Sequence, residues 1–222
     1  MAQDYNSRPV TCENKCSCSE EMHSTRLIVI TGGPGAGKTA VLEMAKKVLC
    51  EHIAILPEAA SIVFGGGFWR IDSQSGRIAA QRAIYHIQTE LESLVVGEKK
   101  WAAALCDRGT LDGFAYWPTE PEIFWKDVNT TYEKELNRYA AVIHLKTPSE
   151  KQGYNHQNPL RIESSKQALE IDQKIQKIWS MHSNYIAIES KDDFLEKAQR
   201  AMREIASHLP ECCRPLLELK KS

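Results

Sequence analysis

The chain has 222 residues, of which 42% are hydrophobic and 26% charged. This is the composition of an ordinary globular protein, and it excludes collagen-like, coiled-coil and wholly disordered chains. With 28 basic and 29 acidic side chains the net charge is −1, so we expect no broad cationic surface for nucleic acid. The apolar runs are too short to cross a bilayer and the first 26 residues hold no signal-like apolar region, which predicts a cytoplasmic protein without a membrane span.

The sequence divides into three parts. Residues 1–25 carry little apolar content and are expected to form a mobile polar leader. Over residues 26–209 short apolar runs alternate with helical patterns, which predicts one α/β domain built from parallel β-α-β units. Residues 210–222 follow as a C-terminal tail.

The predicted elements of the domain can be followed along the chain. Ile84, Ile87, Leu91 and Leu94 recur at the spacing of one helical face in the longest helix. Pro, Gly and Asn without apolar periodicity predict an exposed mobile loop over 147–165, whose length suggests a lid. In chain order we expect a strand at 27–30, a helix at 38–50, a strand at 53–56, an irregular stretch containing Gly65, Gly66 and Gly67, a helix at about 77–96, a strand at 101–106, short helices and loops over 110–132, a strand at 140–145, the lid, a helix at about 166–182, a strand at 185–188 and a helix at 192–209.

Seven cysteines make an odd number, and a disulfide scaffold is not expected. Cys50 and Cys106 lie in apolar segments that are typical of buried thiols. The C-x3-C-x-C cluster near the start lacks a matching second pair of ligands, and whether it binds a metal stays open. The other cysteines form two groups, Cys12, Cys16 and Cys18 in that cluster and Cys212 with Cys213 in the tail.

A glycine-rich motif, GGPGAGKT, begins at Gly32 between a predicted strand and a predicted helix. It satisfies G-x4-G-K-[ST], the pattern of a P-loop that cradles phosphates with backbone N–H groups. A glycine-rich turn without a ligand is the alternative, which the placement disfavours. We expect Lys38 to reach the β- and γ-phosphates and Thr39 to ligate Mg²⁺. The nucleotide-binding residues are therefore predicted as Gly33, Pro34, Gly35, Ala36, Gly37, Lys38 and Thr39.

Asp107 and Arg108 follow the third predicted strand. In a parallel sheet that strand end lies beside the P-loop, at the edge where ligands gather. Asp107 is placed to hold Mg²⁺ directly or through water, and Arg108 to bind a phosphate or another acceptor anion. A strand-end ion pair is the alternative for both residues.

Glu58 follows the second predicted strand, within Leu-Pro-Glu-Ala-Ala. A carboxylate at that strand end can accept the proton of an attacking hydroxyl, which makes Glu58 a candidate general base. It can equally be a helix-start residue favoured by the helix dipole. The two interpretations remain open at this level.

Trp69 and Gln81 are candidates for binding a flat acceptor. Trp69 stands with Phe68 and Arg70 after three glycines, and Gln81 lies early on the next predicted helix. Aromatic surfaces and an amide suit a nucleobase or a similar ring. The alternative is that the aromatic side chains cover the core and that Gln81 faces water.

Arg161 is the permanent cation of the expected lid, within Asn-Pro-Leu-Arg-Ile-Glu at 158–163. A lid arginine can close onto the transferred phosphoryl group and stabilise its oxygens, as an arginine finger supplied by the same chain. An exposed, solvated side chain is the alternative. Arg161 therefore joins Lys38, Glu58 and Asp107 as a predicted catalytic residue.

Together these segments resemble P-loop domains of the AAA-type ATPase family, in the group related to nicotinamide riboside kinases and to the N-terminal domain of the photoreceptor channel translocation-defect protein. The similarity rests on the P-loop, residues 56–60, 106–109 and 158–163, and spans most of 27–209. Glu58 and Asp107-Arg108 also resemble, more distantly, deoxynucleoside and thymidylate kinases. The resemblance implies a three-layer, nucleoside-kinase-like fold with a five-stranded parallel sheet in the order 2-3-1-4-5.

Two functions compete. A small-molecule kinase would bind ATP or GTP with Mg²⁺ on the P-loop and transfer phosphate to a nucleoside-like hydroxyl, with Glu58 as base and with Arg108 and Arg161 steadying the acceptor and the phosphoryl group. A nucleotide-dependent switch or slow NTPase would instead need no acceptor. For the switch, residues 190–193 only loosely imitate the base-recognition pattern N-K-x-D. Acceptor-dependent ADP release distinguishes the two.

Overall fold

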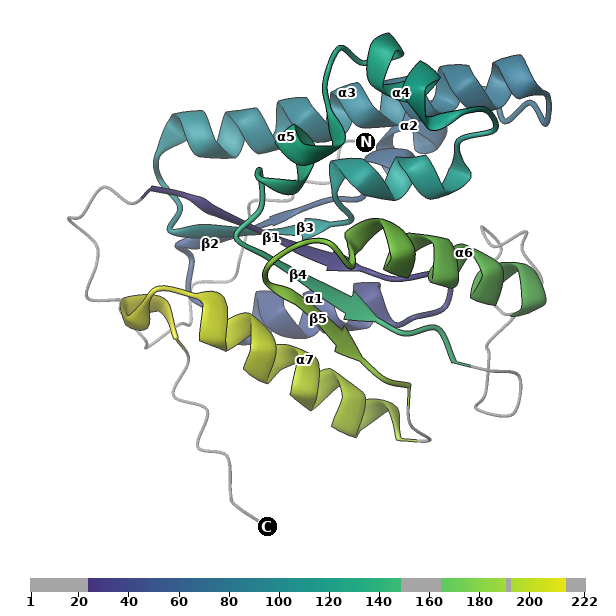
Figure 1. The fold of residues 1–222 in the computed structure, drawn as a ribbon. Helices are drawn as coiled ribbons and strands as arrows, with labels where there is room; N and C mark the ends of the chain where they lie inside the picture. Colours follow the sequence, from purple (N-terminus) through teal and green to yellow (C-terminus); the bar gives the residue numbers. More distant parts are fainter. Residues whose placement is uncertain (1–23, 149–164, 191–192, 215–222) are drawn as a thin grey trace.

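The computed structural model describes residues 24–148, 165–190 and 193–214. Five parallel strands form one sheet in the order β2-β3-β1-β4-β5, with helices on both sides (Figure 1). The predicted fold class and strand order are therefore confirmed. The strands are β1 (Arg26–Thr31), β2 (Ile53–Leu56), β3 (Ala103–Asp107), β4 (Ala141–Leu145) and β5 (Tyr185–Ile188).

Two layers of helices cover the sheet. On one face lie α1 (Lys38–Val48) and α7 (Phe194–His208), and on the other α3 (Gln74–Glu98), η1 (Thr110–Tyr116) and α6 (Ser165–Trp179). Shorter elements complete the described fold: α2 (Ala59–Gly65), α4 (Pro121–Asp127), α5 (Tyr132–Leu136) and η3 (Glu211–Cys213).

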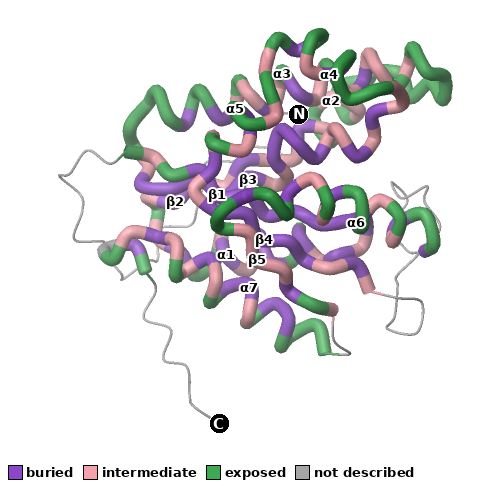
Figure 2. The backbone as a smooth tube through the Cα atoms, in the orientation of Figure 1, coloured by how far each residue is buried: buried purple, intermediate pink, exposed green. Residues whose placement is uncertain are grey.

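The strands are continuously apolar because both faces of the sheet are covered. Ile28 and Ile30 of β1 pack into the core beneath α1 and α7, whereas Leu27 and Val29 pack on the side of α3, η1 and α6. All four side chains are buried, and Figure 2 shows the strands buried in the centre with exposed residues on the outer helices. This rigid sheet positions the loops at the carboxyl ends of its strands.

Helix α2 occupies part of the stretch that was expected to be irregular. Residues Ala59–Gly65 are mostly apolar and form this helix. Gly66 is its C-terminal cap, and Gly67 then adopts a positive φ of 94°. The glycines therefore mark the end of a helix, not a long irregular segment. The third strand also begins at Ala103, two residues later than expected.

The buried face of α3 differs from the predicted one. Leu94, expected on that face, is 61% exposed. The buried residues are Ala80, Tyr85, Gln88, Glu92 and Val95. Apolar periodicity could not identify this face because two of its members are polar and find their partners elsewhere in the fold.

Glu92 is the centre of that polar cluster. Its Oε1 accepts hydrogen bonds from Gln88 Nε2 and from the hydroxyl of Tyr139, both at 2.8 Å. Its Oε2 pairs with Arg138 Nη2 at 2.6 Å. Burial raises the pKa of Glu92, and the charge of Arg138 with the hydrogen bonds offsets only part of that effect. The cluster ties α3 to the segment before β4.

Glu92→Ala should lower the free energy of unfolding by about 3 kcal/mol, because it removes the buried acceptor to which Gln88, Tyr139 and Arg138 donate. Glu90→Ala, at an exposed position of the same helix, is the matched control and should change it by less than about 0.5 kcal/mol. Urea denaturation of both variants measures the difference. Equal stabilities would mean that the cluster does not anchor α3.

Parts of the sequence prediction concern residues outside the described ranges. Of the expected leader over 1–25 and the expected lid over 147–165, the structure describes only 24–25, 147–148 and 165. In the described part of the chain, no helix is both long and apolar enough to cross a membrane. The cytoplasmic location stays a prediction.

Candidate functional site

The P-loop connects the end of β1 to the start of α1. Gly32, Gly35 and Gly37 have φ angles of 137°, 79° and 95°, a region that residues with a side chain rarely adopt. At Gly32 a Cβ atom would also collide with the backbone oxygen of Leu145. The glycines of the motif are therefore required by the path of the backbone, as the sequence predicts for a phosphate-binding loop.

Lys38 is the first residue of α1, and its side chain turns back over the loop. Its Nζ donates hydrogen bonds to the backbone oxygens of Gly32 (2.9 Å) and Gly33 (3.2 Å). Burial and the nearby positive charge of Arg108 lower the pKa of Lys38 to about 8. A bound anion would offset both effects, so the ammonium group is suited to meet phosphate oxygens here.

Asp172 of α6 holds the opposite side of the loop and was missed by the sequence prediction. Its Oδ1 accepts the backbone N–H of Gly33 at 2.8 Å. A signal was present, because Asp172 falls in the buried stripe of α6 that Ala168, Ile175 and Trp179 otherwise fill. An acidic residue in an apolar stripe indicates a partner in another element.

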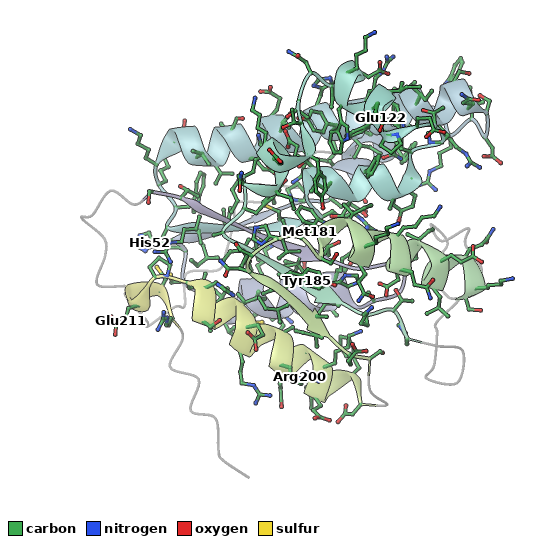
Figure 3. The ribbon with its side chains drawn as sticks, in the orientation of Figure 1. His52, Glu122, Met181, Tyr185, Arg200 and Glu211 are labelled. Atoms are coloured by element: carbon green, nitrogen blue, oxygen red, sulfur yellow. The ribbon has the colours of Figure 1, made fainter. Side chains whose placement is uncertain are left out.

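A buried chain of polar groups links Asp172 to the sheet. His144 Nε2 lies 2.9 Å from Asp172 Oδ1, and the hydroxyl of Tyr185, labelled in Figure 3, lies 2.8 Å from His144 Nδ1. Burial alone raises the pKa of Asp172, but the hydrogen bond and charge of His144 and the Gly33 N–H outweigh it, so the pKa is lowered. The carboxylate that holds the P-loop therefore stays ionised at neutral pH.

Lys197 of α7 is a second residue that the sequence prediction missed. It is buried, and its Nζ donates to the backbone oxygens of Ala36 (2.9 Å) and Lys146 (2.5 Å). Burial lowers its pKa to about 8. Lys197 thus fastens the middle of the P-loop to α7, and no local pattern distinguishes it from a solvated lysine.

Glu58 and Arg108 meet across the ends of β2 and β3. Glu58 Oε1 accepts a hydrogen bond from Arg108 Nε at 2.7 Å, and Ser61 Oγ donates to Glu58 Oε2 at 2.5 Å. Arg108 Nη1 also donates to the backbone oxygen of Gly32 at 3.3 Å, which is the oxygen that Lys38 contacts. The predicted base, the predicted anion-binding residue and the P-loop lysine therefore lie together.

The ion pair controls the basicity of Glu58. Burial alone would raise its pKa, but the charge of Arg108 and the hydrogen bonds from Ser61 and Arg108 lower it to about 2. Glu58 also immediately precedes α2 as its N-cap residue, as the helix-start interpretation expects, while the general-base role stays a prediction. As long as Arg108 stays paired to it, the carboxylate is a weak base.

The backbone of Arg108 is strained. Its φ of 76° is unusual for a residue with a side chain and costs on the order of 1 kcal/mol. Asp112 of η1 supports the turn by accepting the Gly109 N–H at 2.8 Å, and it lies 3.6 Å from Arg108 Nη1. Asp112 was also missed by the sequence prediction, although it stands four residues after Arg108 in an otherwise apolar segment. Such strain, held in place by its surroundings, is typical of functional sites.

Asp107 presents a buried oxygen to this site. Its Oδ1 has no hydrogen-bond partner among the described residues. Burial raises the pKa of Asp107 from 3.8 to about 6, although the charges of Lys38 and Arg108 act in the opposite direction. A divalent cation would satisfy the orphaned oxygen, so the residue fits the predicted role of an Mg²⁺ ligand. Thr39, the other predicted ligand, is the second residue of α1 and is exposed.

The raised pKa of Asp107 predicts a pH-dependent loss of stability. An acid whose pKa is higher in the folded state stabilises that state fully below its unfolded pKa and loses the contribution as the pH rises through the folded pKa. Asp107→Asn should therefore match the wild type at about pH 4 and exceed it by about 3 kcal/mol at about pH 8 in metal-free buffer. Urea denaturation at both pH values tests this. A constant difference between the two proteins would contradict the burial of an ionised carboxylate.

Two predicted acceptor-binding residues have different neighbours in the structure. Trp69 is 77% exposed and lines a hollow of about 380 Å³ with Phe68, Gly76 and Ala79. Gln81 of α3 lies against Gly113, where its Oε1 would be 2.9 Å from an added Cβ. The described contacts place neither side chain against Arg108, so their role in acceptor binding stays a prediction. Arg161 lies outside the described residues.

Comparison with known proteins agrees with this geometry. A family model described as an AAA domain matches residues 27–197, which include the P-loop, Glu58, Asp107 and Arg108. No curated protein matches the chain. The closer relationship to nicotinamide riboside kinases and to the translocation-defect protein stays a prediction.

Proposed function

The chain belongs to the AAA domain family, and we propose that it is an Mg²⁺-dependent phosphotransferase that moves a phosphoryl group from ATP or GTP to a hydroxyl of a small, nucleoside-like acceptor. The observation that carries the proposal is the position of the Glu58–Arg108 ion pair, which meets Lys38 at the backbone oxygen of Gly32. A carboxylate at this place can take the proton of an attacking hydroxyl, and the paired arginine can hold the anionic groups of the reactants.

In the proposed reaction, Arg108 exchanges partners. When phosphate or acceptor oxygens take its guanidinium, Glu58 loses the charge that depresses its pKa, and burial then makes it a better base. Glu58 accepts the proton of the acceptor hydroxyl, whose oxygen forms the new bond to the γ-phosphorus. The bond between that phosphorus and the bridging oxygen breaks, and the nucleoside diphosphate leaves.

The other side chains position the nucleotide. Lys38 neutralises the β- and γ-phosphates, and Asp107 with Thr39 would hold Mg²⁺, which supplies further neutralisation of phosphate charge when bound. Asp172 and Lys197 keep the P-loop in place through Gly33 and Ala36. Arg161 is proposed as the cation that joins the site in the reacting complex.

The decisive experiment measures nucleoside diphosphate release from ATP and from GTP by the full chain, with Mg²⁺ and a panel of nucleosides. A kinase releases diphosphate in proportion to the acceptor and yields a phosphorylated product. Release that no acceptor stimulates would instead support a slow NTPase or a switch. Lys38→Ala, prepared identically, controls for contaminating kinases.

A further inference from the structure

A second cluster of chemically reactive side chains lies away from the P-loop. Cys50 follows α1, His52 precedes β2, and Cys213 is the last residue of η3. One ligand atom from each, two Sγ atoms and an imidazole nitrogen, lies within 4.8 Å of the others. Figure 3 shows His52 and Glu211, the first residue of η3, at the same edge of the molecule.

The topology brings these residues together. Parallel strands place the P-loop at their carboxyl ends, and α1 and α7 each return the chain to the opposite edge, where β2 begins. The turn after α1 is closed by a hydrogen bond from Ile53 N to Cys50 O at 3.1 Å, and His52 O accepts from Ala102 N at 2.8 Å. The backbone around both ligands is therefore held by hydrogen bonds.

The third ligand is held just as firmly. Cys213 is 2% exposed and packs in the core formed with α1 and α7. Its N–H donates to Pro210 O at 2.9 Å, and Arg214 Nε donates to Leu209 O at 3.1 Å. Two of the three side chains thus come from the turn between α1 and β2, and the third comes from η3, which is distant in sequence.

We propose that Cys50, His52 and Cys213 bind a Zn²⁺ ion through two thiolates and one imidazole. Zinc favours this set of sulfur and nitrogen donors in tetrahedral geometry. In such a site the ligand atoms stand roughly 3.5–3.8 Å apart. Because the three atoms already lie within 4.8 Å of one another, each pair has to approach by at most about 1.3 Å. The fourth position is open to water or to a further protein donor.

The ion would fasten the chain end beyond α7 to the turn between α1 and β2. It lies at the edge of the sheet opposite the P-loop, so it has a structural role and no part in the proposed phosphotransfer. The inference is therefore independent of the proposed function. It uses thiols that are not engaged in disulfides in this structure.

The test counts metal in the full chain with Cys12, Cys16 and Cys18 replaced by serine, so that the leader cannot contribute. The protein is stripped of metal under a non-chelating reductant and titrated with Co²⁺ and then Zn²⁺. We expect one ion per chain, an absorption spectrum of tetrahedral Co²⁺ with thiolate charge transfer, and displacement by Zn²⁺. Zinc at about a hundredfold excess over its Kd should raise Tm by about 5–10 °C.

Single substitutions in that background locate the ion. Cys50→Ser, His52→Asn and Cys213→Ser should each weaken Zn²⁺ binding on the order of 100-fold or more. His86→Asn, at an exposed histidine of α3, is the control and should leave the affinity unchanged. The far-ultraviolet circular dichroism spectrum of each metal-free variant shows that it is folded. The proposal is overturned if no stoichiometric ion binds, or if folded Cys50→Ser and Cys213→Ser variants retain it.

Discussion

Lys38→Ala should reduce turnover by at least about 10³-fold and weaken nucleotide binding. Lys38 begins α1, and its side chain turns back over the P-loop. Its ammonium group donates hydrogen bonds to Gly32 O and Gly33 O. Arg108 contacts the same carbonyl, but it comes from the end of β3 and already has a separate role in the proposed reaction, so it should not replace the lost cation. Turnover and nucleotide Kd should be measured for the same preparation.

The control for this variant is Lys47→Ala, an exposed lysine near the end of the same helix. It removes an equal charge from α1 without touching the loop, and both measured quantities should stay at wild-type values. If Lys38→Ala turned over at a near-normal rate, GGPGAGKT would not be acting as a phosphate-binding loop in this chain.

Glu58→Gln should leave nucleotide affinity near normal and slow phosphoryl transfer on the order of 10²–10⁴-fold. Glutamine retains the size of the side chain and an oxygen that can accept from Arg108, but it cannot take a proton from the acceptor hydroxyl. The effect should therefore appear in kcat and not in nucleotide Kd. Single-turnover transfer to the acceptor identified in the nucleoside panel is the measurement.

Ser61→Ala is the matched control, because it removes the hydrogen bond to Glu58 Oε2 while leaving the carboxylate in place. Its transfer rate should stay within about tenfold of the wild type, since a solvent-exposed hydrogen bond contributes only about 0.5–1.5 kcal/mol and the base itself remains. A Glu58→Gln variant with an unchanged rate would leave Glu58 only its structural roles, as the N-cap residue of α2 and the partner of Arg108.

The residues of the sequence by themselves determined the local parts of the fold. Continuous apolar runs indicated the buried strands. The P-loop was recognisable because its backbone path requires glycine and its lysine stands at the start of a helix. The positions of Glu58, Asp107 and Arg108 at strand ends also followed, since parallel strands share one carboxyl edge. The order of the strands came from the resemblance to a known family and was confirmed.

The tertiary structure decided where the polar residues of the buried faces find their partners. Asp172 meets Gly33 from 139 positions away, and Lys197 meets Ala36 from 161 positions away. The buried face of α3 includes the polar residues Gln88 and Glu92. Hydrogen bonds from Arg138 and Tyr139 to Glu92 offset the cost of burying its carboxylate. The spacing of apolar residues along a helix shows only where apolar side chains gather. A buried polar group becomes favourable through a partner that another element supplies, and only the folded chain shows which element that is.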